Sequence, residues 1–193
     1  MTTVGVLAIQ GDFLEHTQAL ARLGVDAPEI RLPGQLDGLD GLVIPGGEST
    51  TIAQLIDIYG FRTALKEKVE SGMPVWGTCA GMIVLADRLI DHRPEPLHLI
   101  NIEVSRNAFG RQVDSFEADI KIDEVIGPPF HCVFIRAPVV TVVGEGVKVL
   151  ARLDDGRPIA VRQGNLLGTS FHPELTDDSR VHELFLRIVE NAA

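Results

Sequence analysis

The chain has 193 residues, of which 45% are hydrophobic and 23% charged, and it carries a formal net charge of −10. The length predicts one compact α/β domain over residues 1–193 that buries its core without metal or disulfide staples. The negative charge argues against nucleic acid or an anionic membrane as the main partner. No apolar stretch approaches the roughly 20 residues that span a bilayer, and no basic segment of a signal peptide precedes the first apolar run. The cytoplasm is therefore the expected location.

The first half of the chain alternates short apolar runs with amphipathic segments, which is the pattern of parallel strands joined by helices. Strands are expected at residues 4–9, 26–32, 41–44 and 74–76, and helices at 12–24, 51–58, 61–71 and from 82 onward. Asp12, with Glu15 three residues later, predicts a capping box at the start of the first helix. Ser49 or Thr50 is the expected N-cap of the second helix.

The second half of the chain is rich in predicted strands. Two prolines within residues 91–96 exclude a regular helix there and predict a turn-rich loop. Strands are expected at residues 99–104, 113–122, 132–135, 139–143, 147–153, 158–162 and 165–168, followed by an amphipathic helix at 180–190. The sequence shows no internal repeat, low-complexity tract or linker, which favours a single α/β domain with a β-rich second half.

Two adjacent glycines, Gly46 and Gly47, follow the apolar run 41–44. Because they lack Cβ atoms, a loop of this kind lets backbone N–H groups turn toward a ligand. It can donate one hydrogen bond to a developing oxyanion, and the N–H of Ala80 can donate another. Taken alone, the motif also fits an ordinary turn between a strand and a capped helix.

Cys79 lies in Gly77-Thr78-Cys79-Ala80-Gly81, between a buried apolar run and a predicted helix. This is the pattern of a nucleophile elbow, a sharp turn that needs small residues two places on either side of the nucleophile. The N-terminal N–H groups of the following helix would stabilise a thiolate. The alternative is that Cys79 is a small buried hydrophobe in a tight turn. With Cys132 as the second of two cysteines, the chain offers no disulfide framework, and a reactive thiol requires a reducing compartment.

His172 supplies the base that a thiol nucleophile needs, since it can take the thiol proton and return it to a leaving amine. It lies at the end of a predicted strand, in Gly168-Thr169-Ser170-Phe171-His172-Pro173-Glu174. Pro173 favours an extended backbone at His172, in which alternate side chains share a face, so Glu174 can orient the imidazole. Only the fold can bring His172 to Cys79. Paired with the elbow, the segment favours catalysis over a solvated loop.

The loops that follow Ile9, Ile44 and Thr78 lie at one edge of the sheet if the strands before them are parallel. Ligands of open parallel sheets bind at the carboxyl ends of the strands. This arrangement places Gln10, the glycine pair and Cys79 around one crevice. The strand before His172 must end at the same edge for a triad to form.

These segments together resemble the class I glutamine amidotransferase family, whose members hydrolyse glutamine with a Cys-His-Glu triad. The match is closer to the branch of glutaminase subunits of pyridoxal 5′-phosphate synthase, and it runs from about residue 4 to the C-terminal helix. The segments that carry it are residues 5–16, 45–51, 77–82, 105–112, 134–138 and 168–174. The Arg106-Asn107 and Ile135-Arg136-Ala137-Pro138 segments discriminate best, because the wider superfamily shares the elbow and His-Pro-Glu. The resemblance implies a three-layer sandwich with a mainly parallel central sheet flanked by helices.

The resemblance implies site residues position by position. The triad is Cys79, His172 and Glu174, the oxyanion hole is Gly47 and Ala80, and the residues that bind L-glutamine are Gly47, Glu48, Ser49, Arg106, Ile135 and Arg136. A substrate α-carboxylate needs a cationic clamp, which arginine supplies. Without the resemblance, both arginines would be assigned to surface ion pairs. Gln10 is expected near the partner contact or the oxyanion loop.

The resemblance also implies a partner. Family members of this branch pass ammonia, unmixed with solvent, to a separate synthase subunit in a hetero-oligomeric complex. That subunit combines the ammonia with a pentose phosphate and a triose phosphate to make pyridoxal 5′-phosphate. The free glutaminase is expected to be nearly inactive until it docks, and no cofactor is expected.

Three other hypotheses stay open at this point. The first is a glutaminase that serves another synthase, such as imidazole glycerol phosphate synthase, although the two discriminating segments speak against it. The second is a noncatalytic regulatory module on the same fold, against which the complete set of Cys79, His172 and Glu174 argues. A cysteine peptidase is the weakest of the three.

The remaining histidines are interpreted as solvated or structural. His16 is expected on the first helix and His182 on the last, while His92, His98 and His131 lie in or beside predicted loops. Their spacing does not form a set of metal ligands, so no metal is predicted. The sequence also lacks the glycine-rich loops that bind nucleotide phosphates.

Overall fold

A computed structural model describes residues 2–106 and 115–192. Its central sheet has seven strands in the order β10-β11-β12-β4-β3-β1-β2. These strands are β1 (Val4–Leu7), β2 (Glu29–Ile30), β3 (Gly41–Ile44), β4 (Val75–Thr78), β10 (Lys148–Arg152), β11 (Pro158–Gln163) and β12 (Leu166–Thr169). The run from β12 to β2 is parallel throughout, and β11 pairs antiparallel with both β10 and β12. The prediction of a mainly parallel sheet is confirmed.

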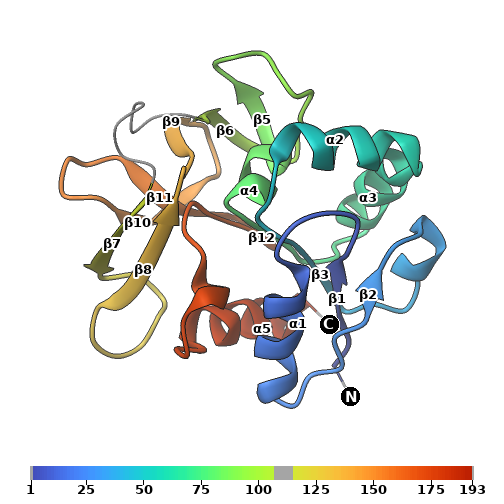
Figure 1. The fold of residues 1–193 in the computed structure, drawn as a ribbon, viewed down its shortest axis with the longest axis horizontal. Coiled ribbons are helices and arrows are strands. Elements are labelled where there is room, and N and C mark those ends of the chain that lie inside the picture. The colour runs from blue at the N-terminus through green and yellow to red at the C-terminus, as the bar shows by residue number, and fades with distance from the viewer. Residues whose placement is uncertain (1, 107–114, 193) are drawn as a thin grey trace.

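Helices cover both faces of this sheet (Figure 1). One face carries α1 (Phe13–Arg22) and α5 (Arg180–Ala192), and the other carries α2 (Ser49–Ile58), α3 (Phe61–Glu70) and α4 (Ala80–Leu85). Neighbouring residues of β3 enter different cores: Val43 packs in the cluster that contains Trp76, and Ile44 in the cluster that contains Phe61. Alternation along a strand therefore builds two apolar layers, which confirms the three-layer prediction. Within the described residues, no helix combines the length and apolarity needed to cross a bilayer.

The second half of the chain is β-rich, as predicted. It adds a three-stranded sheet in the order β5-β6-β9 and a two-stranded sheet of β7 and β8. Their bounds are β5 (Ala86–Leu89), β6 (Ile100–Ser105), β7 (Ser115–Ile120), β8 (Phe130–Ile135) and β9 (Val139–Val143). The beginning of the predicted strand 113–122 and the segment 107–112 lie outside the described residues. The helix predicted from residue 82 is short, because β5 begins at Ala86.

Asp12 is the N-cap residue of α1, as predicted, but the predicted capping box is absent, and the predicted N-cap of α2 is wrong. Asp12 makes no side-chain capping hydrogen bond, and its backbone (φ −86°, ψ 45°) lacks the extended geometry of a cap. The N-cap of α2 is Glu48, whose carboxylate accepts hydrogen bonds from the backbone N–H groups of Thr50 at 3.0 Å and Thr51 at 2.7 Å. Burial opposes the ionised form of Glu48, but the hydrogen bonds from Thr51 and Thr50 outweigh it and lower the pKa of the carboxyl.

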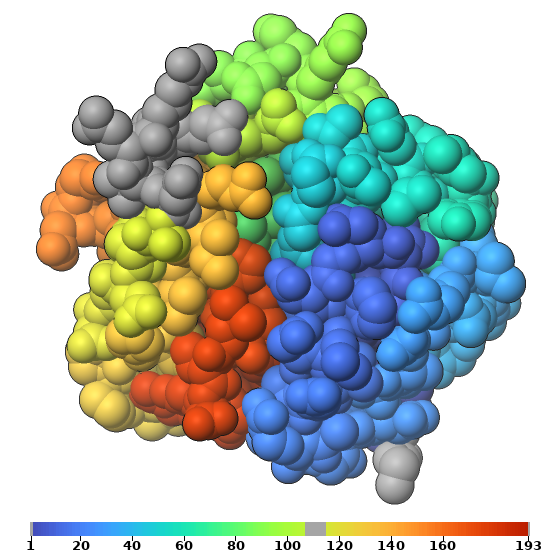
Figure 2. Space-filling model, in the orientation of Figure 1, coloured from blue at the N-terminus to red at the C-terminus, as the bar shows by residue number. Residues whose placement is uncertain are grey.

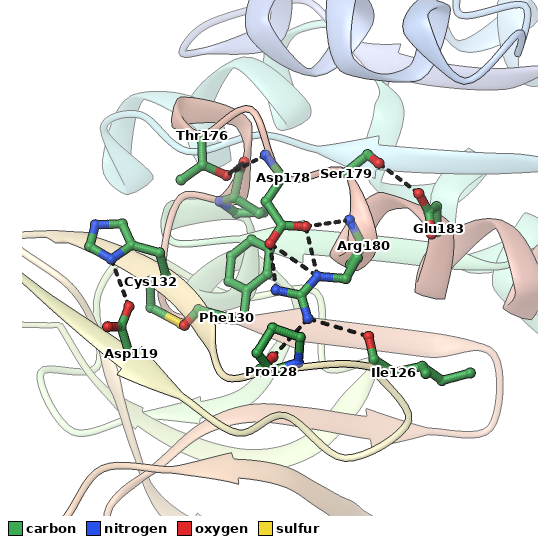
Figure 3. Close-up of polar contacts among 12 residues, drawn as sticks. Asp119, Ile126, Pro128, Phe130, Cys132, Thr176, Asp178, Ser179, Arg180 and Glu183 are labelled. Atoms are coloured by element: carbon green, nitrogen blue, oxygen red, sulfur yellow. Dashed lines mark hydrogen bonds and ion pairs between the residues drawn. The ribbon is translucent and has the colours of Figure 1, made fainter.

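Arg180 ties the start of α5 to the loop that precedes β8 (Figure 3). Its guanidinium donates to Asp178 Oδ2 at 2.6 Å and to the backbone carbonyls of Pro128 at 2.7 Å and Ile126 at 3.3 Å. It also lies 5.7 Å from the centre of the Phe130 ring. Charge-assisted hydrogen bonds of this kind are strong, and the hydrogen bond from Arg180 lowers the pKa of Asp178. The network anchors the chain just after the His172-Pro173-Glu174 segment.

Candidate active site

The carboxyl ends of β4 and β12 lie side by side at one edge of the central sheet. The two strands are parallel neighbours, with Thr78 opposite Thr169. Cys79 directly follows the first strand, and His172 follows the second by three residues. The requirement that both strands end at the same edge is therefore met, and residues far apart in the sequence meet at the position where open parallel sheets bind ligands.

Cys79 has the backbone of a nucleophile elbow. Its φ of 47° and ψ of −104° are strained for a non-glycine residue, and its N–H donates to the Thr169 carbonyl at 2.8 Å. A Cβ added to Gly77 would lie 2.4 Å from the carbonyl carbon of Gly81, and a Cβ added to Gly81 would lie 2.0 Å from the carbonyl oxygen of Ile44. Because real Cβ atoms do not approach backbone so closely, both flanking positions require glycine.

His172 and Glu174 form a buried pair beside Cys79. Their side chains are 4% and 0% exposed, and His172 Nδ1 lies 2.7 Å from Glu174 Oε1. The local conformation differs from the predicted extended segment. Glu174 lies in a short 3₁₀ helix, η2 (Pro173–Leu175), and this turn, not strand alternation, directs its carboxylate to the imidazole.

The pKa of His172 favours a charged imidazole. Burial alone would lower it, but hydrogen bonds to Cys79 and Glu174 and the charges of the same two groups raise the pKa to about 10. Burial raises the pKa of the Glu174 carboxyl, and the hydrogen bond and charge of His172 oppose that effect. The site therefore stabilises an imidazolium paired with the Glu174 carboxylate at neutral pH, which is the form needed to protonate a leaving group.

A cleft of about 590 Å³ opens over these residues. Figure 2 shows the segments that form it meeting on the visible face: the blue N-terminal segment, the cyan α2, and the orange and red segments near residues 135 and 172. The lining residues that were predicted are Gln10, Gly47, Glu48, Ser49, Cys79, Ala80, Arg106, Ile135, Arg136 and His172. Asp12 and Ile83 also line the cleft and were not predicted. Glu174 lies behind His172, away from solvent.

The glycine pair lies against Gln10. The backbone N–H of Glu48 donates to Gln10 Oε1 at 2.9 Å. Gly47 has a φ of 155°, and a Cβ there would lie 2.5 Å from Gln10 Oε1. Gln10 therefore contacts the loop of Gly47 and Glu48. Asp12 is also close, since its N–H donates to the Gly46 carbonyl at 3.0 Å.

Arg106 reaches the cleft from the end of β6. Its Nη1 lies 3.2 Å from Thr50 Oγ1 and 3.5 Å from Ser49 Oγ, and its Nε lies 3.3 Å from Asp91 Oδ2. Arg106 thus makes an ion pair and also faces the cleft. Arg136, the other candidate clamp, has a φ of 43° where the chain leaves β8, and Ile135 beside it presents its carbonyl 3.9 Å from Cys79 Sγ.

Three buried residues beneath the triad were not assigned to the site from the sequence. His16 Nε2 lies 3.3 Å from Glu174 Oε2 and 3.1 Å from Thr78 Oγ1, and His16 Nδ1 lies 3.1 Å from His182 Nε2. Their burial agrees with the structural interpretation of the two histidines. His16 lies on the same face of α1 as the apolar Ala19, three residues later, and this spacing was a signal in the sequence that His16 is buried.

The donor atoms of Asp12, His172 and Glu174 lie within 4.8 Å of one another, which is close enough to consider a metal site. However, the Nδ1 of His172 is already paired with Glu174 Oε1 at 2.7 Å. An imidazole nitrogen that carries a proton for a carboxylate has no lone pair for a metal. We therefore interpret the group through acid–base chemistry.

The chain can be compared with known proteins on this basis. The model of the SNO glutamine amidotransferase family matches residues 6–191. The pyridoxal 5′-phosphate synthase subunit PdxT of Salinispora arenicola (strain CNS-205) is 55% identical over 195 residues, which cover 98% of this chain and 97% of that protein. PdxT of Parafrankia sp. (strain EAN1pec) is 57% identical over 190 residues, with 97% and 93% covered.

Solved structures give the same result. A crystal structure of a glutamine amidotransferase has a TM-score of 0.92 at 51% identity and covers 97% of this chain and 98% of its own. PurLQS from Thermotoga maritima, at 17% identity and a TM-score of 0.72, shares the fold alone. The match of the family model over nearly the whole chain shows that this protein belongs to the SNO glutamine amidotransferase family.

Proposed function

We propose that this glutamine amidotransferase is the glutaminase subunit of a pyridoxal 5′-phosphate synthase, and that it hydrolyses L-glutamine to L-glutamate and ammonia through Cys79, His172 and Glu174. The observation that carries the proposal is the strained elbow of Cys79, which lies at the cleft beside a buried pair of His172 and Glu174. In this pair His172 Nδ1 is 2.7 Å from Glu174 Oε1. Cysteine, base and orienting carboxylate in contact are the parts that acyl transfer from an amide requires.

In the proposed mechanism, His172 holds the proton that the Cys79 thiol has given up, as the imidazolium that its raised pKa favours, and the thiolate sulfur attacks the side-chain carbonyl carbon of glutamine. The resulting oxyanion accepts hydrogen bonds from the backbone N–H groups of Gly47 and Ala80. As the carbon–nitrogen bond breaks, His172 gives its proton to the departing nitrogen, and ammonia leaves a thioester on Cys79. His172 then takes a proton from water, the resulting hydroxide attacks the thioester, and glutamate leaves as Cys79 regains its proton. Glu174 orients the imidazole throughout.

The cleft offers groups suited to the α-carboxylate of glutamine. Arg106 and Arg136 both line it, and a guanidinium binds a carboxylate in two places at once. The Ser49 hydroxyl, 3.5 Å from Arg106 Nη1, supplies a polar group beside the first arginine. The Glu48 carboxylate caps α2 and its backbone N–H donates to Gln10 Oε1, so we assign Glu48 to the site as the residue that holds the loop of Gly47 in place at the cleft.

The partner follows from the names of the relatives. Proteins 55% and 57% identical to this chain are pyridoxal 5′-phosphate synthase subunits. We propose that this chain docks on the corresponding synthase subunit in a hetero-oligomeric complex, delivers ammonia to it, and gains most of its activity on docking. A reactive thiol supports the cytoplasm as the location. The three alternative functions have no observation in their favour.

The test is glutamate release from glutamine, measured for this chain alone, for the chain mixed with the synthase subunit of a pyridoxal 5′-phosphate synthase, and for a Cys79→Ala control. We expect activity in the mixture that disappears in the control. Turnover that depends on Cys79 but is the same with and without the synthase subunit would support the glutaminase activity and overturn the assignment to pyridoxal 5′-phosphate synthesis. No turnover in any mixture, with a folded chain and a synthase that works on added ammonia, would overturn the glutaminase itself.

A further inference from the structure

Two buried histidines lie behind the triad, between α1, α5 and β4. His16 and His182 are 0% and 1% exposed, and their ring centres are 5.2 Å apart. Trp76 of β4 presents its ring at a steep angle to both, with centroid distances of 5.4 Å to His16 and 5.0 Å to His182. This packing holds both imidazoles in place, so their polar atoms have fixed neighbours.

The neighbour that matters most is Glu174. Its Oε1 is occupied by His172 Nδ1 at 2.7 Å. Its Oε2 is buried and makes no hydrogen bond to the described residues, and the nitrogen His16 Nε2 lies 3.3 Å from it. A buried carboxylate oxygen without a donor is costly, and His16 Nε2 is placed to supply one if it carries a proton.

The protons of the two histidines can be assigned from their contacts. Burial, reinforced by the charges of His182 and His172, holds the pKa of His16 well below its ordinary value. Burial and the charge of Arg22 lower the pKa of His182 to about 4. Both rings are therefore neutral at neutral pH, and each has one N–H donor and one acceptor nitrogen.

One arrangement satisfies the contacts. If His16 carries its proton on Nε2, that N–H donates to Thr78 Oγ1 at 3.1 Å and lies beside Glu174 Oε2 at 3.3 Å, and the bare Nδ1 accepts from His182 Nε2–H at 3.1 Å. His182 Nδ1 is then unprotonated, in agreement with its burial without a hydrogen-bond partner among the described residues. The opposite tautomer of His16 would point a lone pair at the carboxylate of Glu174.

We propose that His16 is a positioning residue of the triad: its Nε2–H fixes the second carboxylate oxygen of Glu174, and His182 fixes the tautomer of His16. In this arrangement His182 donates to His16, and His16 presents its N–H to Glu174. The Glu174 carboxylate is then held by His172 at one oxygen and by His16 at the other. Thr78, which directly precedes the nucleophile, shares the His16 donor at 3.1 Å. The kinetic consequence of this proposal rests on the proposed glutaminase function, but the hydrogen-bond assignment does not.

The assignment is tested first without any activity measurement. In chain labelled with ¹⁵N-histidine, correlations of the ring nitrogens with the ring carbon-bound protons distinguish the two neutral tautomers and the imidazolium. We expect His16 and His182 both neutral and both protonated on Nε2, with signals identified by loss in His16→Gln and His182→Gln. A proton on His16 Nδ1, or a charged His16 at pH 7, would overturn the proposal even if the glutaminase is confirmed.

The kinetic test uses the chain in its complex with the synthase subunit. We expect His16→Leu to lower kcat about 10- to 100-fold, because it removes the N–H that the proposal assigns to the buried Glu174 Oε2, with KM unchanged within about twofold. His16→Gln keeps an N–H donor and should lose less. In a Glu174→Ala background, His16→Leu should change kcat by less than about twofold, because residues that act through one another are not additive.

A matched control separates positioning from general damage to α1. Leu20, one turn further along the same buried face of α1, makes no polar contact with the triad among the described residues. Leu20→Ala should lower stability at least as much as His16→Leu while leaving kcat of the folded enzyme within about twofold. Equal losses of kcat for Leu20→Ala and His16→Leu, or an equal loss from His16→Leu with and without Glu174, would overturn the proposal.

Discussion

The two cysteines of this chain are both buried, yet their surroundings differ in every respect that matters for chemistry. Cys132 lies in the middle of β8, is 0% exposed, and its thiol approaches only the Phe130 carbonyl, at 3.6 Å, among the hydrogen bonds of the described residues. Burial, and to a smaller degree the charge of Asp119, raises the pKa of Cys132 to about 12. Cys79, 6% exposed, lies on a strained turn at the sheet edge, where it lines a cleft together with His172 and contributes to the raised pKa of that imidazole.

The difference shows that burial alone does not make a cysteine inert or reactive. A regular strand directs the Cys132 thiol into an apolar layer together with Phe130 and Phe134, where the neutral form is favoured. The elbow instead directs the Cys79 thiol into a cleft with a charged base. Backbone geometry and one neighbouring side chain therefore separate a structural thiol from the proposed nucleophile.

The largest effect is expected from replacing each cysteine in turn. Cys79→Ala should lower glutaminase kcat by about 10⁴-fold or more, since removal of a nucleophile leaves only binding and oxyanion stabilisation. Cys132→Ala should leave kcat within about twofold and lower the free energy of unfolding by about 1 kcal/mol. Steady-state glutamate release and chemical denaturation measure both quantities. A loss of kcat from Cys132→Ala as large as that from Cys79→Ala would break the comparison.

The elbow itself can be tested at its glycines. Gly81→Ala places a Cβ 2.0 Å from the Ile44 carbonyl oxygen, and it should lower the free energy of unfolding by about 3 kcal/mol or more. Gly34→Ala is the matched control, because a Cβ at Gly34 meets no atom within 4 Å, and it should stay within about 0.5 kcal/mol. Equal denaturation midpoints for the two variants would show that the tight turn at Cys79 does not require glycine.

The buried layer beneath the cleft should respond to acid. The pKa of His182 is about 4 in the folded chain, against 6.5 ordinarily. Between pH 6.5 and pH 4, His182 is protonated in the unfolded chain but neutral in the folded chain. The free energy of unfolding therefore decreases as the pH falls, and His182 alone accounts for a decrease of about 3 kcal/mol over this interval. Unfolding measured from pH 7 to pH 4.5 should show this slope, and His182→Gln should flatten it. An unchanged slope in His182→Gln would contradict the burial of a neutral His182.

Short-range signals made much of the fold and site predictable. The apolar runs predicted β3 and β4, and the elbow at Cys79 could be recognised because Gly77 and Gly81 are required by contacts that any such turn makes. The His172–Glu174 contact was also expected, but for the wrong local reason, because a 3₁₀ turn after Pro173 replaces the extended segment.

Tertiary contacts decided the rest. Capping preferences favoured Ser49 or Thr50, yet the longer Glu48 side chain folds back onto two N–H groups. The sequence placed His16 on the first helix as a solvated or structural histidine, and its partner His182 is 166 positions away. No local pattern could show that such a pair lies beneath Glu174.

The most direct test of the central claim is labelling by an electrophilic analogue of glutamine, followed by mass spectrometry of the peptides. It is carried out on the chain in complex with the synthase subunit, with and without excess glutamine. We expect modification of Cys79 that glutamine slows, with Cys132 unmodified in the folded chain. Modification of Cys132 in preference to Cys79, or labelling of Cys79 that glutamine does not slow, would contradict the assignment of Cys79 as the nucleophile of a glutamine site.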